Sequence, residues 1–455
     1  MNLSLPCLRI VAIAMISFFA PTVEAGEETH YQDHLVGERA AAMGGANIAM
    51  ADEATGAHYN PAGIVGSGST LLQVSMSAYK LQMTRAEIAR ICDQRYFDER
   101  KDFFGFPASL GFVTLFGDKI RHALGLHAVI YSMSRGQSAF QIDRIPCDLN
   151  NNLTVGGSHF EIDRSMGWGM TYAIRPIPML RIGLSINFTL RSVSSATSIT
   201  SATNTATGKS TQIEFLNLKA NLFNSHLRAG ILLEPFKGFS IGLSFSTPHF
   251  ALVREGVIDT VMAGADAQGN PVGGGVSLDD ATFNWKVPFV VAFGVAYQRK
   301  ESFAVALDIK LHGPLARYPV FTHSLFNTQG LTTVTNQRNL VVNFNIGGEF
   351  YLNPKWILRA GFFSNFSSYP VLEKGAVQDQ DHLHMYGVTF GGTYRSSDTG
   401  TLSLILQAQY GTGQSMASWL ASTGGNADGS ASSEVVDARD ISLVVSVGGS
   451  FDLSR

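Results

Sequence analysis

The sequence predicts an all-β fold: a 14-stranded antiparallel transmembrane β-barrel plugged by an N-terminal hatch with short helices. Three observations lead to this prediction. Apolar and polar residues alternate over stretches of about ten residues, the length that spans a bilayer as a tilted strand. Short turns and long loops alternate between these stretches, as in outer-membrane barrels. One Ala/Gly-rich segment near the N-terminus fits no strand and is left over to fill the barrel.

The first element, residues 1–25, has the features of a secretory signal peptide. Arg9 precedes an apolar run from Ile10 to Ala20, and Val23-Glu24-Ala25 precedes Gly26, where we expect cleavage. The run is shorter than the roughly 20 residues that a spanning helix needs, so export is favoured over a membrane anchor. We therefore expect the mature chain to reach the bacterial outer membrane.

Composition favours a surface that is partly in contact with lipid. Charged residues make up 15% of the chain, whereas about 25% is usual in soluble domains. The net charge of -3 provides no basic surface for nucleic acid, which we exclude as a partner. Export leaves Cys92 and Cys147 as the mature cysteines, both in predicted loops on one side. An oxidising compartment favours a disulfide between them, and two unpaired buried thiols are the alternative.

Residues 26–69 are expected to form the hatch, and residues 70–455 the barrel with long extracellular loops. The segment from Gly37 to Ile64 is rich in Ala and Gly and is not amphipathic. Small side chains suit a plug that packs tightly inside a barrel and still moves. Pro61 fixes one backbone angle and biases Asn60 toward an extended conformation. Asn60-Pro61-Ala62 is therefore the gate candidate.

The strands follow from the alternation, which is clearest from Leu180 to Leu190, where the even residues are all apolar. In a barrel such a strand turns its apolar face to lipid and its other face to a polar lumen. A secreted β-sandwich is the alternative, but its strands would average only about 5 to 6 residues. The predicted strands are 72–78, 110–116, 124–130, 168–174, 180–190, 216–233, 239–245, 289–297, 303–311, 340–350, 356–362, 386–394, 402–410 and 441–451.

The connections are short turns on one side and long polar loops on the other. The parity of the apolar residues changes within 216–233, from even before Phe223 to odd after Ser225. One extra residue in a strand swaps its faces, so we expect a β-bulge or break there rather than two separate strands. The predicted long loops include Arg85–Lys101 with a short helix, Asp143–Gly157, Ser192–Thr211, Glu255–Asp280 and Gly413–Asp437.

Charged residues on the polar faces of the strands are expected to point into the lumen. Such groups usually pair with one another or with a plug, and a basic one can instead bind a substrate carboxylate through a charge-assisted hydrogen bond. The sequence leaves both roles open for Arg181, Lys219, Arg228, Asp308, Lys310, Glu349 and Arg359. No catalytic residue, cofactor or metal is expected, because the His30/His34 and His382/His384 pairs lack further ligands.

The N-terminal segment resembles the hatch of the FadL-type outer-membrane transporters, which include long-chain fatty-acid and aromatic-hydrocarbon channels. The matching residues are Gly37, Arg39, Ala40, Met43-Gly44-Gly45-Ala46, Ala51-Asp52 and Asn60-Pro61-Ala62. Val287-Pro288, Phe293–Tyr297, Asp308, Ile346–Phe350 and Leu358–Phe362 look like family strands, so the resemblance covers most of the mature chain. It assigns hatch or gate roles to Gly44, Gly45, Asp52, Asn60, Pro61 and Ala62.

The resemblance also implies a mechanism. Hydrophobic substrate is captured among the extracellular loops, passes to an inner pocket, and leaves sideways through the barrel wall when the hatch shifts. The opening is expected on a kinked third strand, here Leu124 to Arg135, where Gly125 or Gly136 allows a kink. An apolar molecule gains free energy by entering the bilayer rather than crossing a water-filled pore.

The expected partners follow from this mechanism. They are a hydrophobic small molecule, with a long-chain fatty acid first and a hydrocarbon next, and the surrounding outer-membrane lipid and lipopolysaccharide. The barrel is expected to be a monomer and not an enzyme. The competing function is a structural or surface-interaction barrel, an adhesin or phage receptor whose loops act while the hatch merely blocks the pore.

Overall fold

The computed structural model describes residues 29–91, 94–106, 109–142, 152–205, 208–323, 335–373, 381–396, 399–420 and 432–454. The predicted signal peptide and the predicted disulfide partners, Cys92 and Cys147, lie outside these ranges. Within them, no helix is long and apolar enough to cross a membrane.

The described residues form a closed antiparallel β-barrel of fourteen wall strands, which confirms the predicted fold class. The barrel closes where β20 pairs with β1. Three of the wall strands are made of two consecutive strands each, β2 with β3, β8 with β9, and β10 with β11. The wall comprises β1 (Leu71–Ile91), β2 (Gln94–Phe106), β3 (Ser109–Phe116), β4 (Arg121–Ile142), β5 (Asn152–Ile177), β6 (Leu180–Thr205), β7 (Gly208–Phe236), β8 (Phe239–Ser246), β9 (Phe250–Ala265), β10 (Pro271–Phe283), β11 (Val290–Arg299), β12 (Phe303–His312), β16 (Val341–Tyr351), β17 (Trp356–Asn365), β18 (His382–Arg395), β19 (Gly400–Leu420) and β20 (Ser432–Asp452).

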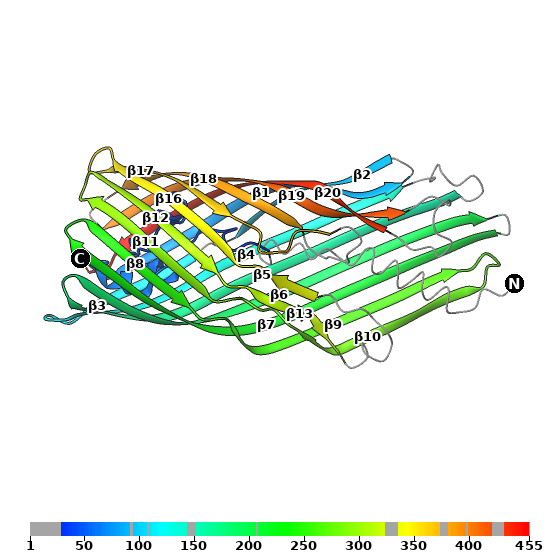
Figure 1. Ribbon diagram of the computed structural model, residues 1–455, viewed down its shortest axis with the longest axis horizontal. Coiled ribbons are helices and arrows are strands. Elements are labelled where there is room, and N and C mark those ends of the chain that lie inside the picture. The colour runs from blue at the N-terminus through cyan, green and yellow to red at the C-terminus, as the bar shows by residue number, and fades with distance from the viewer. Residues whose placement is uncertain are drawn as a thin grey trace.

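Several predicted long loops are strands in the structure. The Ser/Thr-rich stretch Ser192–Thr211 and the Gly-rich stretch Glu255–Asp280 extend the barrel as parts of β6, β7, β9 and β10. The short helix predicted within Arg85–Lys101 is wrong, because this stretch belongs to β1 and β2. These extensions run far beyond the plug (Figure 1). Polar residues on both faces of such an extension hide the alternation on which the prediction relied.

The N-terminal segment lies inside the barrel at the end with the short turns and the C-terminus (Figure 1). We call residues 29–66 the plug. It contains α3 (Glu38–Ala42), η1 (Ala54–His58) and η2 (Pro61–Gly66), and most of its residues are buried. Its backbone packs directly on the wall, since a Cβ on Gly361 of β17 would collide with the backbone of Met43 and Gly44.

The wall strands alternate between an apolar outer face and a more polar inner face. Along β12, Val305, Leu307 and Ile309 are exposed, whereas Asp308 and Lys310 are buried against the plug. The same alternation on the other wall strands gives the barrel an apolar outer band, as a membrane-spanning wall requires.

The predicted bulge in β7 is wrong. β7 pairs with β6 from Gly208 to Leu233 without a register shift, so its even residues face inward along this whole length. Before Phe223 the inward side chains are apolar, since Leu218 and Leu222 pack inside the barrel, and after it they are mainly polar, as with Asn224 and His226. A register shift does occur beside Phe223, but in the pairing of β7 with β9.

A second segment folds into the barrel beyond the plug. It joins β12 to β16 and contains β13 (Leu315–Pro319), β14 (Phe321–Thr322) and β15 (Thr335–Arg338). We call residues 313–323 and 335–338 the inner segment. Its buried Val320 and Phe321 form an apolar cluster with wall residues Val193, Leu218, Ala220, Leu222 and Phe283.

Candidate functional site

The plug is fixed to the wall by a buried ion cluster around Glu349 of β16. Arg39 of α3 donates from Nε and Nη2 to the two carboxylate oxygens of Glu349, both at 3.1 Å. Arg359 of β17 donates from Nε to Glu349 Oε2 at 2.6 Å. Within the plug, Arg39 Nη1 also donates to Asp52 Oδ1 at 2.9 Å. Bidentate charged pairs of this kind are among the strong hydrogen bonds of proteins.

The turn after α3 is held by three wall side chains. Gly44 and Gly45 have φ angles of 65° and 79°, which favour glycine. Asn345 Nδ2 donates to Gly44 O at 2.6 Å, and Lys310 Nζ donates to Gly45 O at 3.2 Å. Asp308 Oδ2 accepts from the next two free amides, those of Asn47 at 2.6 Å and Ile48 at 2.9 Å.

The Asn60-Pro61-Ala62 motif begins η2 and touches the wall. Asn60 is the N-cap of η2 and its Oδ1 accepts from Ala62 N at 3.1 Å, while Pro61 occupies the first helical position. The Nδ2 group of Asn60 donates to Ile48 O of the plug at 2.9 Å and to Ile231 O of β7 at 3.1 Å. Gly230 of β7 leaves room for it, because a Cβ there would collide with Asn60 Oδ1.

The seven charged residues predicted to face the lumen have different roles. Four of them, Asp308, Lys310, Glu349 and Arg359, hold the plug directly or through Glu349, as described above. Arg181 lies beneath the end of η2 and donates to Glu234 of β7 at 2.8 Å. Lys219 is exposed between buried Leu218 and Ala220, so its predicted lumen position is wrong. This prediction failed for the same reason as the predicted bulge in β7, because both assumed that the strand changes faces near Phe223.

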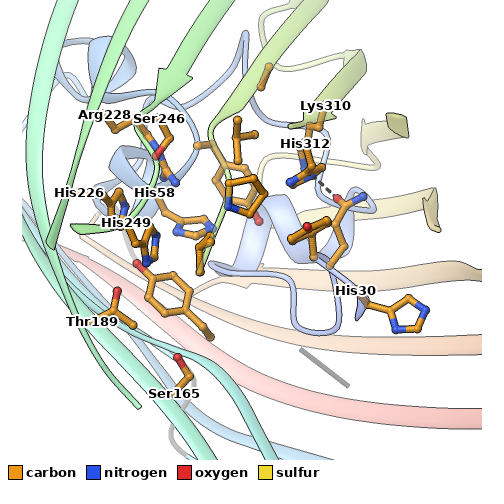
Figure 2. Close-up of a pocket in the computed structure, with 18 of the residues that line it drawn as sticks. His30, His58, Ser165, Thr189, His226, Arg228, Ser246, His249, Lys310 and His312 are labelled. Carbon is orange, nitrogen blue, oxygen red and sulfur yellow. Dashed lines mark hydrogen bonds between the residues drawn. The ribbon is translucent and has the colours of Figure 1, made fainter. Parts of the chain in front are cut away.

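The remaining residue, Arg228, faces a cavity between the plug and the wall. The cavity has a volume of about 200 Å³ and is lined by residues of the plug, of β4 to β8, of β11 and β12, and of β15 in the inner segment. His249, between β8 and β9, and Trp285 to Pro288, between β10 and β11, complete the lining. Aromatic and imidazole rings dominate the lining, and Figure 2 shows several of them around Arg228. They belong to Tyr31, His58, Tyr59, Tyr131, His226, His249, Trp285 and His312.

The electrostatics of this cavity are positive. The side chain of Arg228 makes no hydrogen bond or ion pair with any other residue that the structure describes. The carboxylate in the lining, Asp33, accepts from Asn365 Nδ2 at 2.7 Å. Burial, and next the charge of Arg228, lower the pKa of His58 well below its ordinary value, so His58 is neutral. Lys310 adds a second positive charge, and its Nζ donates to the neutral Gln32 Oε1 at 2.9 Å.

Sequence reasoning found Arg228 but missed the rings around it. His226 and His249 stack with ring centroids 4.2 Å apart, although they come from β7 and from the break after β8. His226 and Arg228 share the inward face of β7, and this parity was the available signal for His226. No sequence signal joins His249 to it, because that contact depends on the pairing of two strands.

A second cavity, of about 170 Å³, lies on the other side of the plug. It is lined by Glu38 and Glu53 of the plug together with Glu349, Arg359 and further polar wall residues. Burial, followed by the charge of Glu53, raises the pKa of Glu38 to about 8. Among the residues with described positions, no group of three histidine, cysteine, aspartate or glutamate side chains could hold a metal ion.

Comparison with solved structures shows the same fold in known membrane channels. A FadL homologue from Pseudomonas aeruginosa superposes with a TM-score of 0.63 at 11% sequence identity, over 93% of this chain and 99% of that chain. The P. putida toluene transporter TodX gives 0.57 at 13% identity, over 92% and 99%. The Ralstonia pickettii toluene transporter TbuX gives 0.54 at 13% identity, over 92% and 100%.

Comparison at the level of sequence gives no match, either to protein-family models or to curated proteins. The similarity of this chain to known proteins therefore rests on the fold alone. It establishes that this chain has the fold of the FadL-type channels, as the N-terminal motif and the strand pattern predicted.

Proposed function

We propose that this protein is an outer-membrane channel for the uptake of hydrophobic compounds, and that its cargo is a long-chain fatty acid. The observation that carries the proposal is Arg228, a cation without a protein partner among the described residues, in a ring-lined cavity between plug and wall. A cavity of this kind suits a ligand with an apolar body and one anionic group.

The charge of the cavity is the argument for a carboxylate cargo. A buried cation is costly unless an anion accompanies it. A fatty-acid carboxylate beside Arg228 would accept a charge-assisted hydrogen bond, while its chain would contact Trp285 and the tyrosine and histidine rings. The similar solved structures include two toluene transporters, TodX and TbuX. A neutral hydrocarbon would leave Arg228 without an anion, so we favour the fatty acid.

The plug acts as the hatch in this proposal, and residues 26–69 are its proposed extent. It supplies Ile48, His58 and Tyr59 to the cavity, so a movement of the plug changes the shape of the binding site. Gly44, Gly45 and Asp52 position α3, and Asn60-Pro61-Ala62 couples η2 to β7. Cargo binding is thereby linked to the contacts that hold the plug.

Replacement of Arg228 tests the cargo class. In cells that lack their own transporter, R228Q is expected to reduce uptake of labelled oleate about tenfold or more, because a hydrogen bond to a charged group contributes about 1.5–3 kcal/mol. R228K keeps the charge and is expected to retain part of the uptake. Diffusion-corrected uptake of labelled toluene is the second measurement, and R228Q is expected to leave it unchanged.

The matched control is K219Q, which removes one positive charge from the outer face of the same strand. Surface expression of all variants is compared by labelling of intact cells. Undiminished oleate uptake by R228Q would contradict the proposed role of Arg228. Equal losses for oleate and toluene would mean that Arg228 supports the fold rather than the carboxylate.

The proposed location is the outer membrane, after removal of residues 1–25, with the barrel as a monomer among lipid and lipopolysaccharide. The apolar outer band of the wall supports this location. Sequencing the N-terminus of protein from the outer-membrane fraction tests it, and Gly26 is the expected first residue.

A surface-interaction barrel is the second candidate. The observation in its favour is the length of the polar strands beyond the plug, such as the Ser/Thr-rich end of β6. Removing the β9–β10 tip, residues 261–275, separates the two functions. Lost adhesion or phage adsorption with normal oleate uptake would favour the second candidate.

A further inference from the structure

Two neighbouring wall strands are interrupted at positions that lie side by side along the barrel wall. Between β8 and β9 the chain reads Thr247-Pro248-His249, and between β10 and β11 it runs from Asn284 to Phe289 and contains Pro288. Proline has no N–H to donate to a ladder. Pairing between these two wall strands therefore stops at Ser246/Val290 and resumes at Gly256/Ala281.

The end of β10 turns away from the wall. Thr282 and Phe283 pair with β14 of the inner segment instead of β9. Asn284 continues this deviation, since its N donates to Val320 O at 2.7 Å and its Nδ2 to Pro319 O at 3.1 Å. Among the residues with described positions, one edge of β9 consequently has no strand partner over Phe250–Glu255, while its other edge still pairs with β7.

This unpaired stretch is open on both faces. All six residues from Phe250 to Glu255 are exposed, whereas exposed and buried residues alternate along a closed wall strand such as β12. We call the space between Phe250–Glu255 and residues 284–286 the wall window. His249 N to Val287 O, at 3.2 Å, marks its lower edge, and Arg254 Nη1 to Asn284 Oδ1, at 2.9 Å, crosses it.

The ring-lined cavity reaches the wall window. His249, Trp285, Lys286, Val287 and Pro288, which form the two strand breaks, all line that cavity. Trp285 forms the inner edge, with its ring under the guanidinium of Arg191 at 4.7 Å. Arg191 is itself fixed by Asp163, whose Oδ1 accepts from its Nε at 3.0 Å.

The window lies at the edge of the apolar outer band that is farther from the short turns. Leu243 and Phe245 of β8, just below it, are exposed apolar residues of the outer face. Phe223, which pairs with Val253, stacks with Trp168 and Phe188 at ring distances of 5.9 and 5.8 Å. Aromatic girdles of this type mark the membrane–water interface in barrels.

From these observations we infer that the wall window is the lateral exit through which cargo passes from the cavity into the outer leaflet. Its chemistry fits a single-chain amphiphile with a carboxylate. Phe250 and Leu252, each 55% exposed, flank the path of the chain. Arg254 and Lys286, both exposed, stand where the carboxylate would remain at the interface. Irregular backbone at membrane depth is tolerated where it lines such a cavity.

This position differs from the third strand, where the resemblance implies an opening. β4 does have an irregularity there, a register shift with β5 between Ile130 and Ser132. The ring of Tyr131 fills that point, because a Cβ on Gly167 would collide with it. β4 contributes only Tyr131 to the cavity lining, whereas the two strand breaks contribute five residues.

A reversible cross-link across the window tests the inference, which rests on the proposed uptake function. The variant R254C/N284C is made in a chain with Cys92 and Cys147 replaced by serine, and is closed with a short bifunctional methanethiosulfonate. Uptake of labelled oleate is expected to fall to the level of cells without the protein and to return after reduction. The control pair D259C/S277C joins the same wall strands above the window and is expected to keep its uptake.

A second readout does not depend on transport. Purified R254C/N284C in phosphatidylcholine bilayers is exposed to a palmitate analogue with a diazirine near its carboxylate. Labelling is expected in residues 249–255 and 284–288 when the window is open, and is expected to disappear when it is cross-linked. If the uncross-linked protein takes up no oleate, the proposed uptake function is contradicted. The labelling pattern alone then decides whether the wall window is an exit. Uptake that survives the cross-link, or labelling concentrated on β4, would overturn the inference.

Discussion

At the scale of residues, Asn60 joins three parts of the molecule through one side chain. Its amide caps η2, bonds the carbonyl of Ile48 in the plug and bonds the carbonyl of Ile231 in the wall. The first two contacts are buried and the third is partly buried. Sequence reasoning identified Asn60 as part of the gate candidate, but it could not identify Ile231 as its partner in the wall.

We predict that N60A loosens the plug. The substitution removes the donor to the buried carbonyl of Ile48 and the donor to the partly buried carbonyl of Ile231, and a buried polar group left unsatisfied costs about 1–3 kcal/mol. Amide hydrogen exchange, measured by mass spectrometry, is expected to accelerate in residues 45–66 while β16 to β18 stay protected. N270A in the exposed β9–β10 turn is the control. Unchanged protection of residues 45–66 would mean that the close packing of plug and wall is sufficient without Asn60.

Glu38 gives the plug a dependence on pH. Its folded-state pKa of about 8 lies above the ordinary value of 4.5, and each unit corresponds to about 1.4 kcal/mol. The stabilising effect of protonation is complete below pH 4.5 and is lost as the pH rises through 8. We therefore expect the wild-type plug to loosen between pH 5 and 9.

The variant E38Q, which stays neutral, tests this expectation. It is expected to match wild type near pH 5 and to show the greater plug protection near pH 9, by the same exchange measurement. E255Q, on the exposed edge of β9, is the control and is expected to follow wild type at both values. Parallel loss of protection in E38Q and wild type would exclude Glu38 as the titrating group.

At the scale of elements, predictions succeeded where one face of a strand meets lipid and the other meets the lumen. The apolar residues of β12 and β16 alternate for this reason, and both strands were predicted to within a residue or two at each end. Beyond the apolar band, the outer faces of β6 and β7 are mostly polar, with Ile213 and Phe215 as exposed exceptions on β7. Their Ser/Thr-rich ends were therefore predicted as a loop, although they pair over their full length.

The error in β7 has a different physical cause. Its apolar residues change parity because the inside of the barrel changes, from a polar wall around the plug to the apolar cluster around Phe321. The strand itself does not change faces. A single sequence gives no sign that the connection after β12 folds inward to create this cluster. The inner segment also pairs with the end of β10, which therefore leaves β9. Because the sequence gives no sign of this pairing, the wall window could not be predicted either.

At the scale of the whole molecule, the plug and the inner segment divide the lumen. The plug closes one end through buried polar contacts, chiefly those of Glu349, Asp308 and Asn60. The inner segment fills the lumen beyond it with apolar contacts. Between them lies the positively charged, ring-lined cavity, which reaches the wall window at the upper edge of the apolar band.

This division predicts the result of deleting the plug. Removing residues 29–66 after the cleavage site takes away none of the wall pairings, so the barrel is expected to insert and to keep its strand content. Water would then hydrate Asp308, Lys310 and Glu349, whose plug partners are gone, and Arg359, which holds the plug only through Glu349. Ionic conductance in planar bilayers is expected to rise above that of the full chain, because the inner segment alone does not seal the plug end.

The same variant separates a specific channel from a simple pore. The cavity loses Ile48, His58 and Tyr59 on deletion, so saturable oleate uptake is expected to disappear even as conductance rises. A plug-deleted barrel with closed conductance would show that the inner segment is the true barrier. Full saturable uptake without the plug would show that the wall alone binds the cargo, and the hatch contacts would then have no part in transport.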